Sequence, residues 1–162
     1  MNFFVQNREK LYDSIPENSV LLLFARSLQH KSADAFYPYW PNRDFYYLTG
    51  MKEPDLVFMA YRKKNYVKEI LWIVDRDPTM VRWIGDVIHK DQATAISGIK
   101  DVRYTKDLDS FLGQCFISSS FTKLFTAFNR RDLKMPYSET EIFLQDIQSK
   151  YPYISIKPLN PL

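Results

Sequence analysis

The chain offers few of the side chains that hold a catalytic metal ion. A hydrolytic zinc or manganese site needs several histidine, carboxylate or thiolate ligands around one ion. The two histidines, His30 and His89, lie far apart in sequence and outside any His-Glu-x-x-His arrangement. We expect each to be a surface or hydrogen-bonded residue. Asp75 and Asp77 flank an arginine and precede a proline, which favours a solvated loop over a cation site.

The sequence also contains no recognisable motif for nucleophilic catalysis or for phosphate binding. The sequence contains no Gly-x-Ser-x-Gly turn, and the single cysteine, Cys115, lies in an apolar helical segment where a thiol is usually inert packing. With four glycines, neither a Walker motif nor a dinucleotide fingerprint is present. The residues therefore predict an α/β domain with no recognisable catalytic residues.

Composition sets the class of protein. At 162 residues, 46% hydrophobic and 25% charged, the chain fits one folded domain. A net charge of +3 is too small to indicate nucleic acid as a partner. One cysteine excludes an intrachain disulfide, and no apolar run reaches the length of a signal peptide or a membrane span. We expect a cytoplasmic protein that binds neither nucleic acid nor membrane.

The helices and strands that must position any site can be predicted from the spacing of apolar residues along the chain. Residues 19–25 form an apolar run typical of a strand covered on both faces, and the basic run 62–65 is expected at the solvated tip of a hairpin. Residues 26–42 are expected to form an ordered loop, because prolines interrupt them. Further strands are predicted at 45–49, 56–61, 66–74, 102–104, 123–128 and 153–157, and helices at 3–14, 91–97, 108–118 and from a capping box at Ser138 and Glu141. This order predicts an α/β fold with a mixed sheet flanked by helices on both faces.

One segment adds a resemblance. Residues 32–55 read SADAFYPYWPNRDFYYLTGMKEPD. They closely resemble the signature of the aminopeptidase P N-terminal domain, which runs Ser-x-Asp, Tyr-x-Phe/Tyr-Arg-Gln, Asp-Phe-Tyr-Tyr-Leu-Thr-Gly and Glu-Pro. The segment 82–85, Arg-Trp-Ile-Gly, stands where that family has Trp-x-Gly. Trp40 and Pro41 depart from the pattern, because relatives commonly have Arg-Gln there.

The resemblance implies a fold and a division of labour. Creatinase and prolidase N-terminal domains of this kind are similar in fold to ribonuclease H-like domains. Residues 1–157 would be the domain and residues 158–162 the start of a linker to a C-terminal metallopeptidase domain. That domain would hold two divalent metal ions, typically manganese, whereas this chain would hold none. The parent enzyme would be a Xaa-Pro aminopeptidase, which removes an N-terminal residue that precedes proline, and this chain alone would be inactive.

The resemblance also implies roles for particular residues. In a protein of this family, the N-terminal domain would mediate subunit contacts in a homo-oligomer, a dimer or tetramer. It would also restrict the access of proline-containing peptides to the active site. Trp83 matches the tryptophan that can reach a neighbouring subunit's substrate site, although a half-buried structural tryptophan is an equal alternative. The signature residues are expected to determine the fold first and to line the site second; they are Asp34, Tyr37, Asp44, Tyr46, Tyr47 and Gly50. Trp72 is expected in the core.

Two other classes of function stay open at this point. Peptidase-like domains of this type also occur in histone-chaperone subunits, which bind protein without cleaving it. A ribonuclease H-like nuclease would need several convergent carboxylates at strand ends, and the sequence shows no convincing set.

Overall fold

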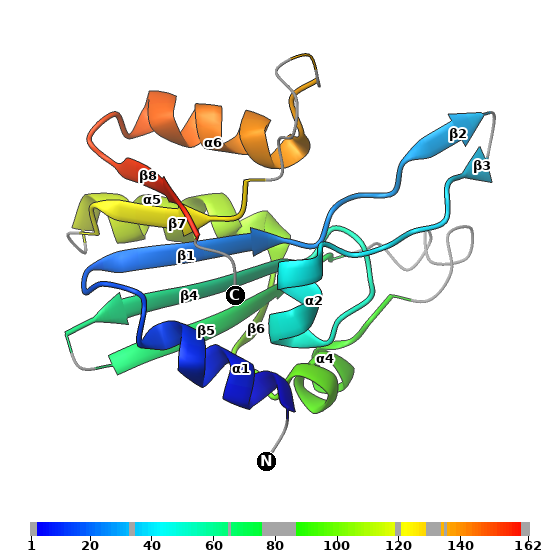
Figure 1. The fold of residues 1–162 in the computed structure, drawn as a ribbon, viewed down its shortest axis with the longest axis horizontal. Coiled ribbons are helices and arrows are strands. Elements are labelled where there is room, and N and C mark those ends of the chain that lie inside the picture. Colours follow the sequence, from blue (N-terminus) through cyan, green and yellow to red (C-terminus); the bar gives the residue numbers. More distant parts are fainter. Residues whose placement is uncertain are drawn as a thin grey trace.

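The structure, a computed structural model, describes residues 3–32, 35–64, 66–75, 87–118, 121–128, 134 and 136–159. A sheet lies between two layers of helices, and a small hairpin extends away from it (Figure 1). The elements in chain order are α1 (Phe3–Tyr12), β1 (Ser19–Phe24), β2 (His30–Ser32), β3 (Ala35–Phe36), α2 (Arg43–Thr49), β4 (Val57–Lys63), β5 (Tyr66–Ile73), α4 (Lys90–Ser97), β6 (Val102–Tyr104), the 3-10 turn η1 (Thr105–Asp107), α5 (Leu108–Ser118), β7 (Lys123–Thr126), α6 (Glu139–Lys150) and β8 (Ser155–Pro158).

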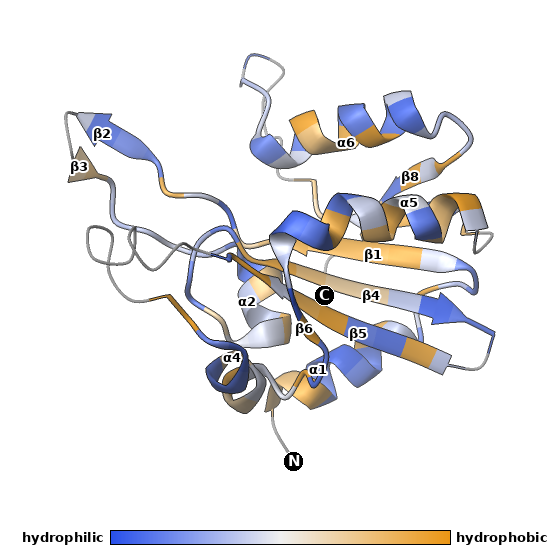
Figure 2. Cartoon of the chain, turned by 180° about the vertical axis from the view of Figure 1, so that it is seen from behind, coloured by the Kyte–Doolittle hydropathy of each residue, from blue (hydrophilic) through white to orange (hydrophobic). Residues whose placement is uncertain are grey.

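The main sheet has six strands in the order β6-β5-β4-β1-β7-β8. Strand β4 runs antiparallel to both of its neighbours, and every other neighbouring pair is parallel. Strand β1 occupies an interior position and is apolar along almost its whole length (Figure 2). The predicted mixed sheet, and the interior place of its most apolar strand, are confirmed.

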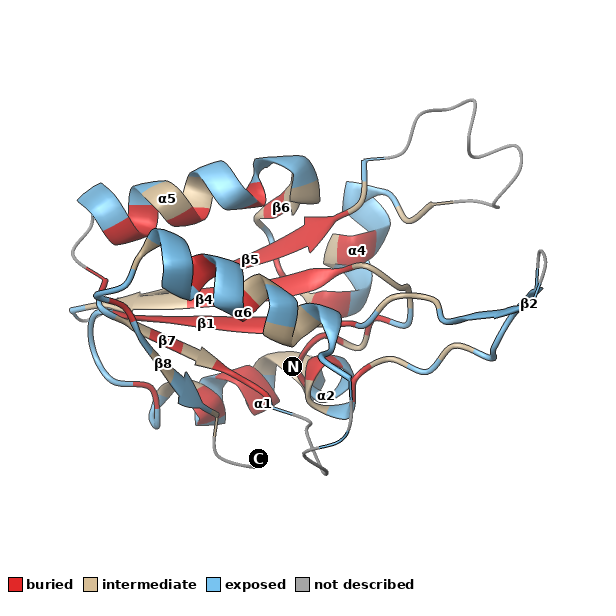
Figure 3. Cartoon of the chain, turned by 90° about the horizontal axis from the view of Figure 1, so that it is seen from above, coloured by how far each residue is buried: buried red, intermediate tan, exposed pale blue. Residues whose placement is uncertain are grey.

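Alternate residues of β1 face two separate cores. Leu21 and Leu23 point into the core beneath α1, α2 and α4, whereas Val20 and Leu22 point into the core beneath α5 and α6. Trp72, fully buried, belongs to the second core, as expected. The inward faces of the helices are buried and their outer faces exposed (Figure 3). A strand buried on both faces explains the unbroken run of apolar residues.

The strand predicted at residues 45–49 is wrong, because this segment is the helix α2. The Asn42 side chain caps the helix by accepting hydrogen bonds from the backbone N–H groups of Asp44 (2.9 Å) and Phe45 (3.4 Å). At the other end Gly50 takes the left-handed conformation, with φ 71°. These two caps outweigh the β propensity of the aromatic residues between them.

The predicted hairpin of β4 and β5 is confirmed, but Arg62 is not at its tip. Arg62 lies within β4, and its guanidinium donates to the backbone oxygens of Tyr12 (2.8 Å) and Ile15 (2.9 Å). It therefore fixes the end of α1 to the sheet. Lys64, exposed with φ 50°, is the basic residue at the turn.

The remaining elements follow the sequence closely. Helices α1, α4, α5 and α6 lie where predicted, and the capping box is present: Ser138 Oγ accepts from the Glu141 N–H at 3.2 Å, and the Glu141 carboxylate accepts from the Ser138 N–H at 2.8 Å. Of the loop predicted at 26–42 the structure describes residues 26–32 and 35–42, and these include the paired strands β2 and β3, which the sequence did not predict. Pro158 closes β8, and a boundary after residue 157 stays a prediction.

A buried arginine joins one helical layer to the sheet. Arg8 of α1 is fully buried, and its guanidinium donates to the backbone oxygens of Leu48 (2.6 Å) and Ser97 (3.0 Å), in the last turns of α2 and α4. Its Nε donates to the Glu69 carboxylate on β5 at 3.0 Å. The Tyr12 hydroxyl donates to the same carboxylate at 2.6 Å. Burial, followed by the charge of Glu69, raises the pKa of Tyr12, so this hydroxyl stays a donor.

Replacing Arg8 with Met should lower the free energy of unfolding by about 3–5 kcal/mol, because two helix-end carbonyls and Glu69 would lose their donor inside the protein. Urea denaturation measures this loss. Lys10→Met, an exposed change on the same helix, should alter stability by no more than about 0.5 kcal/mol. Equal effects of the two substitutions would contradict the role given to Arg8.

Candidate functional site

The candidate site lies at the carboxyl ends of β1 and β7, which are parallel neighbours. Ligands of open α/β sheets usually bind at this edge. Tyr39 fastens the loop that passes over it, since its hydroxyl lies 2.9 Å from the backbone oxygen of Ala25 and 3.1 Å from that of Glu53. Burial raises the pKa of Tyr39, which keeps the hydroxyl protonated as a donor.

The signature residues separate into two groups in space. Asp44, Tyr46 and Tyr47 lie on α2, and Gly50 caps that helix. Tyr37 lies just beyond β3, half exposed, with the Lys31 ammonium 5.8 Å from its ring centre. Asp34 and Trp83 fall outside the described residues. Their predicted roles, and site-lining roles for the others, stay predictions.

The tyrosines of α2 pack against α1. Tyr47 contacts the ring of Phe3 edge-on with centroids 6.0 Å apart, and Tyr46 contacts Phe4 in the same way at 6.1 Å. A Cβ on Gly50 would overlap the Phe4 ring. Gly50 is thus required twice, for its positive φ and for the close approach of Phe4. This half of the signature builds the contact between two helices.

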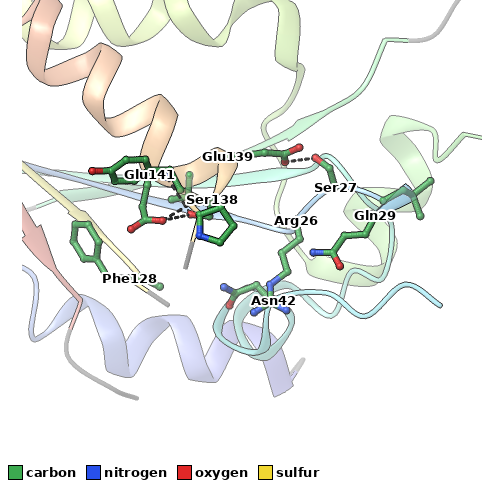
Figure 4. A pocket seen from close by; sticks show the side chains of 13 residues that line it. Arg26, Ser27, Gln29, Asn42, Phe128, Ser138, Glu139 and Glu141 are labelled. Atoms are coloured by element: carbon green, nitrogen blue, oxygen red, sulfur yellow. Dashed lines mark hydrogen bonds between the residues drawn. The ribbon is translucent and has the colours of Figure 1, made fainter. Parts of the chain in front are cut away.

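A pocket of about 400 Å³ opens beside the edge of the sheet (Figure 4). Its walls come from the segment after β1, the N-cap of α2, the end of β7 and the first turn of α6. Residues that line it include Arg26, Gln29, Asn42, Phe128, Ser138 and Glu139. The Ser27 hydroxyl donates to the Glu139 carboxylate and so ties two of these walls together. Sequence reasoning did not single out this pocket, although the capping box marks one of its walls.

Metal-binding side chains do not gather in the part of the chain that the structure describes. No three histidine, cysteine, aspartate or glutamate residues there are placed to share an ion. His30 lies on β2 with its ring edge-on to Phe36, and His89 begins α4, where its N–H donates to Gln92 at 3.0 Å. Asp75 pairs with Lys106. The described residues therefore do not fit the family's metal ions, and absence of a metal site in the whole chain stays a prediction.

Cys115 lies in the core beneath α5, as its apolar neighbours indicated. Burial raises the pKa of its thiol to about 11. A thiol with this pKa is almost entirely protonated near neutral pH, and the thiolate is the nucleophile. The position suits packing and does not suit catalysis.

The sequence and the fold both match one family. Residues 4–125 match the aminopeptidase P N-terminal domain. The chain belongs to this family. The Xaa-Pro aminopeptidase of Escherichia coli is 32% identical over 97 residues, which cover 59% of this chain and 22% of that protein. The Haemophilus influenzae Xaa-Pro aminopeptidase is 30% identical over 82 residues, 51% of this chain and 19% of that protein.

Solved structures agree with this assignment. A Bacillus anthracis protein assigned as an aminopeptidase P superposes with a TM-score of 0.94 at 36% identity, covering 98% of this chain and 38% of that one. A variant of E. coli aminopeptidase P gives 0.75 at 24% identity, over 91% and 32% of the two chains, and shows the shared fold. The chain thus spans about a fifth of the curated relatives and just over a third of the B. anthracis chain.

Trp40, which departs from the signature described above, is exposed to solvent. Its side chain is 77% exposed, although the residues on either side are anchored: Tyr39 through its hydroxyl, and Asn42 through an N–H bond of 2.9 Å to Ala25 O. Pro38 and Pro41 restrict the backbone further. The loop therefore presents the Trp40 indole to solvent from an anchored backbone.

No helix in the described part of this aminopeptidase P N-terminal domain has the length and apolar character needed to cross a bilayer.

Replacing Gly50 with Ala should lower the free energy of unfolding by about 2 kcal/mol or more, from the left-handed backbone and from overlap with Phe4. Urea denaturation measures the change. In a protein that already carries Phe4→Ala, Gly50→Ala should lower the free energy of unfolding by less, because only the strain of the left-handed backbone is left. Equal costs with and without the Phe4 ring would contradict the close approach.

Cys115 in the native aminopeptidase P domain should resist iodoacetamide at pH 8, because at a pKa of about 11 roughly one thiol in a thousand is ionised and the group is buried. The same thiol should react in urea. Mass spectrometry reads out both states. Native labelling as fast as labelling in urea would show an exposed, reactive thiol.

Proposed function

We propose that this chain acts as the non-catalytic N-terminal domain of a Xaa-Pro aminopeptidase, with hydrolysis carried out by a C-terminal metallopeptidase domain of the same polypeptide. The observation that carries the proposal is the family match over residues 4–125, together with relatives named Xaa-Pro aminopeptidase. The lack of a metal-ligand cluster among the described residues supports the division of labour. The substrates of the whole enzyme would be peptides with proline in the second position.

The N-terminal domain would contribute subunit contacts and control of access. The β2–β3 hairpin supports this, because it extends from the body (Figure 1) and carries exposed Phe36, with exposed Tyr37 and Trp40 in the loop that follows β3. Exposed aromatic side chains are common anchors at protein interfaces. The whole enzyme would be a cytoplasmic homo-oligomer, a dimer or tetramer, with two manganese ions held by its C-terminal domain.

Trp83 would gate the substrate site of a neighbouring subunit. A tryptophan suits this task because it presents a large rigid apolar face and can stack on a proline ring. The chain between Asp75 and Val87, which contains Trp83, follows directly after β5, whose carboxyl end lies at the same edge of the sheet as that of β1.

The test uses a longer chain that includes the downstream metallopeptidase domain, assayed with manganese on a Xaa-Pro peptide. Trp83→Ala should lower kcat/KM about tenfold or more, the loss expected for one aromatic anchor, and leave the free energy of unfolding unchanged. Trp83→Phe should restore part of the activity. Unchanged kinetics in a folded Trp83→Ala enzyme would contradict gating, and a downstream sequence without metal ligands would contradict the peptidase assignment.

A further inference from the structure

The pocket at the carboxyl edge of the sheet has walls of opposite chemical character. Arg26, Gln29 and Asn42, which follow β1 and cap α2, present guanidinium and amide groups on one side. Glu139 and Glu141, in the first turn of α6, present carboxylates on the other. Figure 4 shows Arg26 and Asn42 on the same side of the pocket, away from the two glutamates. A ligand that fits must therefore satisfy donors at one end and anionic acceptors at the other.

The Asn42 side-chain amide offers hydrogen-bond donors to the pocket. Asn42 is 7% exposed, and its Oδ1 is used by the N–H groups of Asp44 and Phe45. Within the described parts of the chain, no acceptor takes a hydrogen bond from its Nδ2. Because Asn42 lines the pocket, these two N–H donors are available to an occupant. A polar group that lines a pocket and has no protein acceptor is a typical contact point for a ligand.

Arg26 adds a cation beside this amide. Its guanidinium forms no ion pair or hydrogen bond with the described residues, and its backbone has φ 86°, a conformation that a residue with a side chain rarely adopts. A planar guanidinium next to a planar amide matches the two oxygens of a carboxylate. The donor side of the pocket thus suits a carboxylate.

The opposite wall argues against a simple anion. The Glu139 carboxylate accepts from Ser27, and that of Glu141 accepts from the Ser138 N–H (2.8 Å) and hydroxyl (3.0 Å). Each ionised carboxylate has about four acceptor sites, so Glu139 can also accept from an ammonium group. Two carboxylates and one guanidinium would repel a dianion, whereas a molecule with both charges would meet a partner at each end.

We infer that this pocket binds a small zwitterion, a free α-amino acid, with its carboxylate on Arg26 and Asn42 and its ammonium on Glu139. The volume of about 400 Å³ lies in the range of small-ligand sites. This binding site goes beyond the proposed peptidase function and does not depend on it. Failure of one would leave the other standing.

The test is a titration of the ¹⁵N-labelled 162-residue chain with glycine and with L-alanine, followed by NMR. The Asn42 side-chain amide should shift and saturate. Acetate and methylammonium, which carry one half of the ligand each, should bind about tenfold more weakly or worse at matched ionic strength, because each satisfies one wall.

Variants separate recognition from folding. Asn42→Asp keeps the oxygen that caps α2 but replaces the amide donors with an anionic oxygen, so binding should be lost while the free energy of unfolding is retained. Arg26→Gln and Glu139→Gln should each weaken binding about tenfold. Arg43→Gln, which removes an exposed charge outside the pocket, should have no effect. Absence of a saturable shift, equal binding of acetate and glycine, or unchanged binding in Arg26→Gln and Glu139→Gln would each overturn the inference.

Discussion

The buried guanidinium of Arg8 is the interaction on which one whole layer of the domain depends. Helices α2 and α4 both end at a left-handed glycine, Gly50 and Gly98, and carbonyl groups in their last turns have no partner within the helix. Arg8 donates to one carbonyl of each helix, and its charge is balanced by Glu69 on β5. A cation at two helix carboxyl ends is also favoured by both helix dipoles. Three helices are thereby fixed to the sheet through one side chain. This contact sets the place of α2 over the sheet. Helix α2 also carries the most recognisable residues of the family signature.

Elements whose local signals agree with one another could be predicted from sequence. The run at residues 19–25 was recognisable as an interior strand because burial on both faces requires apolar residues throughout. The Ser138–Glu141 box marked the start of α6 because both of its hydrogen bonds are local. The failure at α2 has a physical reason: Phe45, Tyr46 and Tyr47 favour strands, and only the caps at Asn42 and Gly50 reveal a helix. Arg62 was misplaced because its partners, the carbonyls at the end of α1, are set by the tertiary fold.

The candidate site was harder to predict than the fold. The signature residues on α2 were expected to determine the fold first, and their packing against Phe3 and Phe4 agrees with that order. The pocket was missed because its walls come from segments more than a hundred residues apart, which meet only through the parallel pairing of β1 with β7. Arg26 belongs to no motif, and a charged residue just after an interior strand is the signal that points to it. Asn42 lies within the signature segment, where its role as the cap of α2 gives no indication of a pocket. The domain is a scaffold that displays side chains at one edge of a sheet. Helix α1 packs on α2, and Tyr39 anchors the loop that presents the Trp40 indole.

The proposal that hydrolysis is carried out by a separate metallopeptidase domain depends on one point, that these 162 residues hold no hydrolytic metal centre of their own. Isothermal titration of the metal-free chain with manganese tests it most directly, because binding is measured apart from activity. The account predicts no saturable binding at micromolar metal, since the described histidines and carboxylates are dispersed or paired with cations. Saturable uptake of two manganese ions per chain, lost when carboxylates of this chain are replaced by amides, would contradict it.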